Sequence, residues 1–385
     1  MSAIIGAVFF LCLFLIFYVY AGYPILAACV GFFLPRPVRR NAAGEAPRVT
    51  ILIPAYNEES GIQKTLENKL ALDYPRERME IVVVSDGSED RTDEIVRGYA
   101  DQGVKLLRQE PRGGKTKALN MALHNIRGEI VVFSDANSIY STNALKMLVR
   151  NFADPDVGYV TGKMIYTNPD GSTIGDGCSA YMKYENWLRR LETRAGSVVG
   201  VDGGIDAVRK DLYKPMNPDH LPDFILPLRV VEQGYRVVYD PDALLKEPAL
   251  NEEKDEHRMR VRVTLRALWA LYDMRHLLSF RKYGLFALQL WSHKVLRYAC
   301  FAFLLGAFVS NALLWNAHFL YKLCLVAQAA GYGGAALSPI LEKRGIRVRI
   351  LFFLRYFVLI NFSAAAGAYR FLKGHKQVFW TPRKG

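Results

Sequence analysis

The sequence predicts an α/β domain built on a mostly parallel sheet, set between apolar segments that enter a membrane. Two observations carry this prediction. From Arg48 onward, short apolar runs typical of buried strands alternate with amphipathic stretches typical of helices, which favours parallel strands joined by right-handed crossovers. The most apolar stretches lie instead at the two ends of the chain, where they are long enough to span a bilayer.

The charge of the chain is divided unevenly along its length. The 385 residues are 51% hydrophobic and carry a formal net charge of +13. Residues 1–44 carry +3, residues 45–253 carry −7, residues 254–300 carry +7 and the remainder carries +10. An acidic globular part argues against a nucleic-acid partner, whereas basic residues beside apolar spans are typical of a cytoplasmic membrane surface. The five cysteines show neither metal spacing nor a disulfide framework, so the middle of the chain is expected to be a reduced, cytoplasmic domain.

Residues 1–40 are predicted to form an N-terminal transmembrane helix. Residues 3–34 are almost entirely apolar, which is enough for one long spanning helix. The basic segment Arg36–Arg40 follows this run, so the positive-inside rule places it in the cytoplasm and the amino terminus outside. A signal peptide would have a shorter apolar run and its basic residues on the other side.

Residues 45–251 are predicted to form the globular domain. Its buried-strand runs are VTILIP (49–54), EIVVVS (80–85), VKLL (104–107) and EIVVFSD (129–135). Helices are expected at about 58–70, 90–101 and 115–126, with a later helix at 223–233. Ligands of such sheets bind beyond the carboxyl ends of the strands, so the polar residues that follow each strand are the candidates for a site.

Residues 252–297 are predicted to form amphipathic helices that lie on the membrane surface. The stretch 252–283 is helix-like and places apolar residues on one side among interspersed arginines, which is typical of an interfacial helix. Residues 284–297 are expected to continue it.

Residues 298–385 are predicted to form a C-terminal transmembrane region with a basic tail. Two spans are expected at about 298–316 and 318–338, and a further apolar run covers 350–369. If this run were a fourth full span, the basic tail would lie outside, against the positive-inside rule. The run also contains Arg355, and a charged side chain that faces lipid is unfavourable in free energy. The sequence favours four spans and leaves open a re-entrant or protein-packed segment at 350–369.

Polar residues end three of the predicted strands. The segments are Pro54-Ala55-Tyr56-Asn57-Glu58-Glu59, Ser85-Asp86-Gly87-Ser88 and Ser134-Asp135-Ala136-Asn137. Helix capping and turns explain any one of these segments, because Ser, Asp and Asn favour such positions. Their joint occurrence at three strand ends predicts one cleft.

These segments resemble those of the inverting family 2 glycosyltransferases, which use nucleotide-sugars and have the GT-A fold, a Rossmann-like, mostly parallel sheet. The resemblance is strongest to the membrane-embedded bacterial branch with cellulose, hyaluronan and poly-N-acetylglucosamine synthases. It covers about residues 45–280 in order. Its matching segments are Pro54–Glu58, Ser85–Ser88, Gly113–Asn120, Asp135–Asn137, Gly203-Gly204-Ile205, Pro222-Asp223-Phe224 and Leu228-Arg229.

The resemblance implies a set of donor-binding and metal-binding residues. Tyr56, Glu58 and Asp86 would contact the nucleoside part of the donor, and Lys115 and Lys117 would face its diphosphate. Pro54, Asp135 and Arg262 would also belong to the donor site. Surface lysines are the plainer interpretation of Lys115 and Lys117, although the preceding glycine pair suits a phosphate-binding loop.

Asp135 and Asn137 match the family's Asp-x-Asp metal motif, which implies Mg²⁺ or Mn²⁺ because both residues offer oxygen ligands. The departure is Asn137, where many relatives carry Asp. Its amide oxygen ligates without adding charge, which lowers the expected metal affinity.

The resemblance also implies a catalytic base and an acceptor site. Asp223 would take the proton of the acceptor hydroxyl, although an N-cap role explains it as well and Pro222 replaces the usual acidic neighbour. Gly203 and Gly204 would bind the acceptor. Arg262 matches the Arg of the Gln-x-x-Arg-Trp motif without its Gln or Trp, which puts processivity in doubt.

The sequence therefore predicts a hexosyltransferase of the bacterial inner membrane, multi-pass, with a cytoplasmic catalytic domain. It would transfer a sugar from a nucleotide-sugar, most simply a UDP-sugar, with inversion to a growing polysaccharide or glycan. Glycosyl transfer to a polyprenyl-phosphate lipid is the alternative enzyme, and a non-catalytic membrane scaffold of the same fold is the alternative outside catalysis. The expected partners are the donor, a glycan or lipid-linked acceptor, membrane lipid and polysaccharide export proteins. The stretch 378–382 (VFWTP) is interpreted as a gate or an interfacial anchor.

Overall fold

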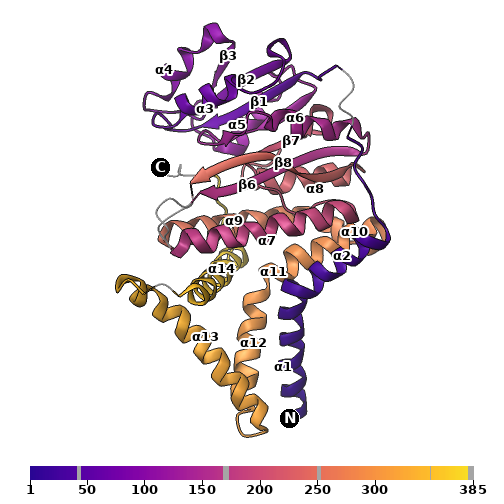
Figure 1. The fold of residues 1–385 in the computed structure, drawn as a ribbon, viewed down its shortest axis with the longest axis vertical. Coiled ribbons are helices and arrows are strands. Elements are labelled where there is room, and N and C mark those ends of the chain that lie inside the picture. Colours follow the sequence, from indigo (N-terminus) through magenta and orange to yellow (C-terminus); the bar gives the residue numbers. More distant parts are fainter. Residues whose placement is uncertain (41–44, 168–172, 249–252, 347, 380–385) are drawn as a thin grey trace.

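The computed structural model describes residues 1–40, 45–167, 173–248, 253–346 and 348–379. A globular α/β part stands on a narrower group of long helices (Figure 1). The globular part is built on one eight-stranded sheet in the order β3-β2-β1-β4-β7-β6-β8-β5. The predicted α/β class is therefore confirmed.

The four strands that the apolar runs predict form the parallel half of the sheet. They are β1 (Val49–Ala55), β2 (Met79–Ser85), β3 (Val104–Arg108) and β4 (Ile130–Phe133). The other half contains β5 (Ile139–Tyr140), β6 (Val157–Thr167), β7 (Asp206–Arg209) and β8 (Arg236–Pro248), and β7 runs antiparallel to both of its neighbours. The carboxyl ends of β1 and β4 thus lie side by side and form one edge for the site.

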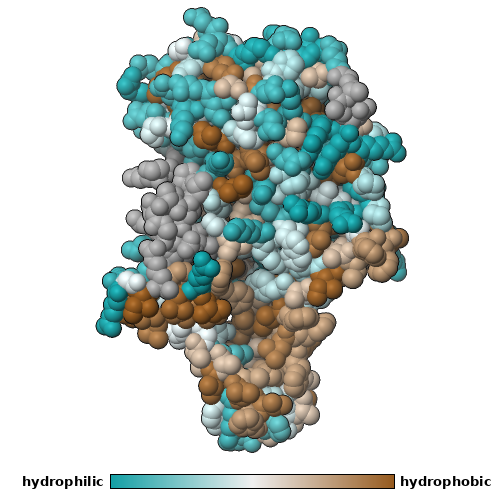
Figure 2. All heavy atoms as spheres, viewed as in Figure 1, coloured by the Kyte–Doolittle hydropathy of each residue, from teal (hydrophilic) through white to brown (hydrophobic). Residues whose placement is uncertain are grey.

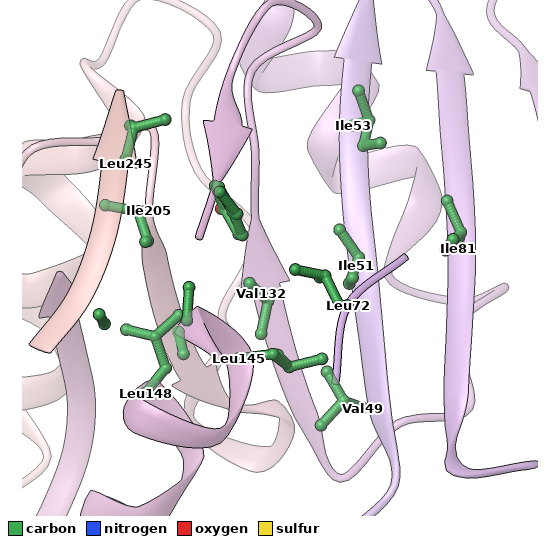
Figure 3. Close-up of a cluster of buried hydrophobic side chains, with 14 of the residues drawn as sticks. Val49, Ile51, Ile53, Leu72, Ile81, Val132, Leu145, Leu148, Ile205 and Leu245 are labelled. Carbon is green, nitrogen blue, oxygen red and sulfur yellow. The ribbon is translucent and has the colours of Figure 1, made fainter. Parts of the chain in front are cut away.

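Helices cover both faces of the sheet because alternate strand residues point to opposite sides. Val49, Ile51 and Ile53 of β1 belong to one buried cluster, whereas Leu52 belongs to the other. Figure 3 shows the first cluster, in which Val49 of β1 and Val132 of β4 lie beside Leu145 of a covering helix. The first face is covered by α3 (Ile62–Leu70), α4 (Thr92–Arg97) and α6 (Ala144–Val149), and the second by α5 (Lys115–Ala122), α8 (Pro222–Glu232) and α9 (Glu253–Asp273).

The N-terminal apolar run forms one continuous helical segment over Ser2–Phe33. It consists of α1 (Ser2–Phe17), a π-helical turn at Tyr18–Gly22 and α2 (Tyr23–Phe33), which leaves α1 at an angle (Figure 1). The helix α2 packs against α7 (Thr173–Ala195) beneath the sheet. The first apolar segment therefore joins the group of candidate membrane spans to the globular domain.

Three helices among the described residues are long and apolar enough to cross a membrane. They are Ser2–Phe33, α13 (Phe319–Lys343) and α14 (Arg349–Leu372). A fourth candidate is a pair of segments, Phe280–Tyr298 and α12 (Cys300–Leu313), that meet at a bend of 58°. Figure 2 shows hydrophobic side chains gathered on this lower part of the molecule.

The continuous helix predicted at 252–283 is wrong. The helix α9 ends at Asp273, a 3₁₀ turn follows at Arg275–Leu278, and α10 (Phe280–Leu290) begins after it. Gly284 has a φ of 49° and breaks α10 again, because only a residue without a Cβ adopts such a backbone easily. Two further short helical segments, a π-helix at Trp291–Val295 and α11 (Leu296–Tyr298), lead into α12.

Arg355 in the last apolar run is paired within the protein. Its guanidinium forms ion pairs with Glu253 of α9 and, at 3.2 Å, with Glu342 of α13. The helix α14 packs along α9 and α13, so the arginine faces protein. These ion pairs compensate the charge of Arg355, so the free-energy cost of a lipid-facing arginine does not arise in this segment.

Candidate active site

A cavity of about 320 Å³ begins at the strand ends and extends to the helices that are candidate membrane spans. Its upper wall contains Pro54 near the end of β1, Glu58 after β1, Asp135 and Asn137 after β4, and Lys115 at the start of α5. Two of the three strand ends predicted to form one cleft thus line this cavity, and the segment Ser85–Ser88 after β2 does not. Its floor contains residues of α9, α11 and α14.

Glu58 lies where the first strand turns into helix α3. Burial raises the pKa of its carboxyl to about 7, with further contributions from the charges of Asp135 and Asp90. The side chain therefore carries a partial proton near neutral pH. A cation or a donor group that enters the cavity would favour its charged form.

Asp86 anchors the glycine loop that precedes α5. Its buried carboxylate accepts hydrogen bonds from the backbone N–H of Gly113 at 2.7 Å and of Gly114 at 2.9 Å, and from the side chain of Gln109. Gly114 has a φ of 90°, which a glycine adopts without strain. Asp86 therefore sets the shape of the loop, and its contact with a nucleoside remains a prediction.

The C-terminal segment reaches the same loop. The guanidinium of Arg112 lies 3.5 Å from the ring centre of Tyr56 and 5.2 Å from that of Phe379. A Cβ on Gly114 would lie 2.8 Å from the carbonyl oxygen of Val378. The predicted gate or anchor at 378–382 thus begins against the glycine loop, and its residues 380–382 lie outside the described residues.

The two lysines predicted to face the diphosphate have different positions. Lys115 lines the cavity and forms an ion pair with Asp135. Burial alone would lower the pKa of Lys115, but the carboxylates of Asp135 and Asp223 outweigh it and raise the pKa. Lys117 is exposed and does not line this cavity, so the structure supports only Lys115 as a phosphate-facing side chain.

Asp223 lies at the start of α8 with its carboxylate in the cavity. Burial raises its pKa, and the ammonium of Lys115 opposes that rise. The carboxylate rests on Gly203, where an added Cβ would lie 2.5 Å from Oδ2 of Asp223. The predicted base and the predicted acceptor glycine are therefore neighbours.

Asp206 holds the turn on which Asp223 rests. Its carboxylate is fully buried and accepts hydrogen bonds from the N–H of Gly203 and the hydroxyl of Tyr159, both at 2.9 Å. Burial raises the pKa of Asp206 to about 7. Gly204 packs instead against Leu245 and Ser138 of the sheet region.

Arg262 of α9 lines the cavity, and its contact with the donor diphosphate stays a prediction. Sequence reasoning missed Arg266, one turn later, which donates hydrogen bonds to Thr116 at 2.8 Å and to backbone carbonyls at 218–220. The i, i+4 spacing of the two arginines was the available signal, because it places both on one helix face. Burial lowers the pKa of Arg266 to about 10.

The oxygen ligands fit a divalent cation only in part. Asp135 is 37% exposed and, like Asn137, lines the cavity. Among the described residues no group of three or more His, Cys, Asp or Glu side chains could hold a metal. A hard cation here would therefore take Asp135 and Asn137 together with oxygens of the donor diphosphate, a set typical of Mg²⁺.

Comparison with known proteins identifies the domain. Residues 50–214 match the family described as Glycosyl transferase family 2. The chain is 27% identical over 300 residues to the probable glycosyltransferase YdaM of Bacillus subtilis, covering 72% of this chain and 68% of that protein. It is 28% identical over 246 residues to the poly-beta-1,6-N-acetyl-D-glucosamine synthase of Staphylococcus aureus, covering 60% of this chain and 59% of that protein.

A solved structure extends the likeness to nearly the whole chain. The mannosyltransferase PcManGT from Pyrobaculum calidifontis, in complex with GDP-Man and Mn²⁺, superposes with a TM-score of 0.72 at 24% identity. The superposition covers 96% of this chain and 99% of that one, which establishes the fold. The chain therefore contains a glycosyl transferase family 2 domain with the GT-A fold.

Proposed function

We propose that the protein transfers a sugar from a nucleotide-sugar, with inversion, to the hydroxyl of a membrane-associated acceptor. One observation supports this most: Lys115, Asp135 and Asp223 line a single cavity that continues to residues of the apolar helices. A donor at the strand ends and an acceptor from the membrane side would then meet at Asp223.

The transfer requires one base and a stabilised leaving group. The carboxylate of Asp223 takes the proton of the acceptor hydroxyl while that oxygen bonds to the anomeric carbon. The bond from this carbon to the diphosphate oxygen breaks, and the nucleoside diphosphate leaves with the electron pair. Lys115 and Arg262 stabilise its negative charge, so no acid partner is needed.

A divalent cation at Asp135 and Asn137 would neutralise the diphosphate and so favour its departure. The protein's part is to orient the two oxygen ligands at the end of β4. We propose Mg²⁺ or Mn²⁺, and the Mn²⁺ in the PcManGT complex is consistent with this choice.

We propose a UDP-sugar as donor and a β-linked glycan or glycolipid as product. The S. aureus relative is a poly-N-acetylglucosamine synthase, and a further relative, 31% identical over 190 residues, is the beta-monoglucosyldiacylglycerol synthase of Trichormus variabilis. The chain covers only 41% of the latter protein's length. GDP-mannose belongs in the test because PcManGT was solved with it.

The donor is tested with purified full-length protein in detergent. The protein is given radiolabelled UDP-glucose, UDP-N-acetylglucosamine and GDP-mannose with Mn²⁺, and free nucleotide and labelled product are measured. We expect turnover with one UDP-sugar. A high-mass product indicates a polymerase, a chloroform-soluble product indicates lipid transfer, and no turnover with any donor favours a scaffold.

We further propose that the GT-A domain faces the cytoplasm of a bacterial inner membrane. The acidic globular part lies between basic segments. Basic residues near spans favour the cytoplasmic side, where anionic lipids attract each of them by about 1 kcal/mol. A cysteine introduced at Asp101, an exposed residue far along the sheet from the spans, should react with a membrane-impermeant maleimide only after the cells are opened. Labelling of intact cells would contradict this orientation.

A further inference from the structure

The cavity continues beyond Asp223 into a part that the transfer step does not use. This membrane-side part is lined by Tyr20 of the first apolar segment, Tyr298 of α11, and Ile360, Asn361 and Ala364 of α14. Three different candidate spans therefore contribute to its walls. An occupant that extends through this part would have one end among the membrane helices.

Besides Arg260, which pairs with Glu256 at 2.8 Å, three Arg or Lys side chains line the same part of the cavity: Arg189, Lys294 and Arg297. Two of them have a carboxylate partner. Arg189 pairs with Asp202 at 2.6 Å, and Arg297 pairs with Glu185 at 2.6 Å.

The remaining acidic group, Glu192, already has other partners. It accepts hydrogen bonds from the hydroxyl of Tyr23 at 2.5 Å and from the N–H of Val199 at 3.1 Å, and it lies 2.7 Å from His293. His293 thereby separates Glu192 from Glu185, which lies 3.3 Å from its other ring nitrogen. The local carboxylates are thus all engaged.

Lys294 is the basic side chain of this group without a carboxylate partner among the described residues. Within the described part of the chain its ammonium has neither a hydrogen bond nor an ion pair, and it lies 5.6 Å from the ring centre of Phe224. It also touches Gly200, where an added Cβ would collide with it. Phe224 follows the proposed base Asp223 directly, so this cation lies beside the acceptor end of the cavity.

A cation without a partner in such a place is costly. Transfer of an ammonium group from water into a protein interior is unfavourable unless an opposite charge compensates it. Lys294 lies in the π-helical turn Trp291–Val295, and π-helical turns inside helices are frequent at functional sites. Glu185 and Glu192 act on Lys294 only as nearby charges, and among the described residues neither forms an ion pair with it, so the direct anionic partner is expected from a ligand.

We propose that Lys294 binds the phosphate of a phosphate-bearing membrane lipid whose hydroxyl faces Asp223. This inference rests on the proposed function and adds the class of acceptor. Ile360 and Ala364 offer apolar contacts to the lipid chain, and the ammonium offers three donors to the phosphate oxygens. The phosphate binds and orients the acceptor, and the hydroxyl is the nucleophile, so the proton still goes to Asp223.

Lipid binding without donor tests this inference separately from catalysis. Full-length protein in dodecyl maltoside is titrated with phosphatidylglycerol or with diacylglycerol of the same acyl chains, and bound lipid is counted by native mass spectrometry. We expect Lys294→Met to bind phosphatidylglycerol 10- to 100-fold more weakly, as loss of a charged hydrogen bond implies. Diacylglycerol binding should be unchanged, and Lys294→Arg should retain most of the affinity.

Lys282→Met is the matched control, because Lys282 is an exposed lysine of α10 that does not line the cavity. Equal weakening by Lys282→Met and Lys294→Met would overturn the proposal, as would equal binding of both lipids by the wild type. Lys294→Gln replaces the methionine variant if that variant does not accumulate. The same titration with a polyprenyl diphosphate sugar identifies the kind of lipid. Whichever of the two phosphate-bearing lipids binds with the higher affinity is the better candidate for the acceptor.

The outcomes separate the two proposals. If the wild type binds phosphatidylglycerol through Lys294 but turns over no donor, the proposed function fails and the lipid site stands. If the wild type transfers sugar and Lys294→Met binds phosphatidylglycerol normally, the lipid site fails and the transferase stands.

Discussion

Asp223→Asn should abolish sugar transfer while leaving donor binding almost intact. The amide keeps the size of the carboxylate but cannot accept the acceptor's proton, and loss of a general base costs typically 10²–10⁴-fold in rate. The donor should still bind because Lys115 and Asp135, which also line the cavity, are unchanged. Turnover is measured by release of nucleoside diphosphate, and donor affinity by isothermal titration calorimetry.

The pH profile separates this role from a structural one. Burial raises the pKa of Asp223 above its ordinary value, and catalysis needs the deprotonated form. The wild-type rate should therefore fall as the pH drops through this raised pKa and stay high above it. The residual activity of Asp223→Asn should lack that acidic limb.

Asp211→Asn serves as the control for the same chemical change. Asp211 is exposed in the 3₁₀ turn Lys210–Leu212 and does not line the cavity. It should keep wild-type rate and pH profile. Turnover of Asp223→Asn at the wild-type rate would show that another group is the base.

Local patterns predict the parallel half of the sheet better than the other half. The strands β1, β2 and β4 are nearly uninterrupted apolar runs, because the side chains on both faces of a covered parallel strand are buried. The strand β6 contains Thr161, Lys163 and Thr167 among its apolar residues, and β8 contains Asp240 and Asp242. Such strands carry no comparable signal in the sequence.

The same contrast applies to the site. Strand ends place Glu58 and Asp135 in the cavity by topology alone, so the sequence predicts them. The membrane-side part depends on which charges pair across the fold: Arg297 and Glu185 are far apart in the chain and meet only through tertiary packing. No local pattern shows that Lys294 forms no such ion pair within the part of the chain that the structure describes.

The helix break after Asp273 is a third feature that local sequence patterns do not predict. The residues after Asp273 are charged and apolar residues that suit a helix. The chain turns there because Leu277 is buried in the core cluster that also contains residues of α8 and α9. Tertiary burial outweighs helix propensity, which is worth less than about 1 kcal/mol per residue.

Asp135→Ala should remove both the dependence on divalent cations and the activity. Asp135 is the one carboxylate of the Asp135–Asn137 pair, so its loss leaves an amide and the donor phosphates as ligands. A metal that stabilises the leaving diphosphate contributes several kcal/mol, which corresponds to a rate loss of about 10³-fold. Lys115 would also lose its ion-pair partner, so donor affinity should change together with the rate.

The measurement combines activity with direct metal binding. Free Mn²⁺ is followed by electron paramagnetic resonance in the presence of nucleoside diphosphate, with Asp135→Ala, Asn137→Asp and the exposed Asp101→Ala compared with the wild type. We expect no bound Mn²⁺ for Asp135→Ala and unchanged binding for Asp101→Ala. Asn137→Asp restores a second carboxylate and should bind Mn²⁺ more tightly while staying active, because carboxylates are stronger ligands of hard cations than amides. Full wild-type activity in excess chelator would contradict a metal-assisted reaction.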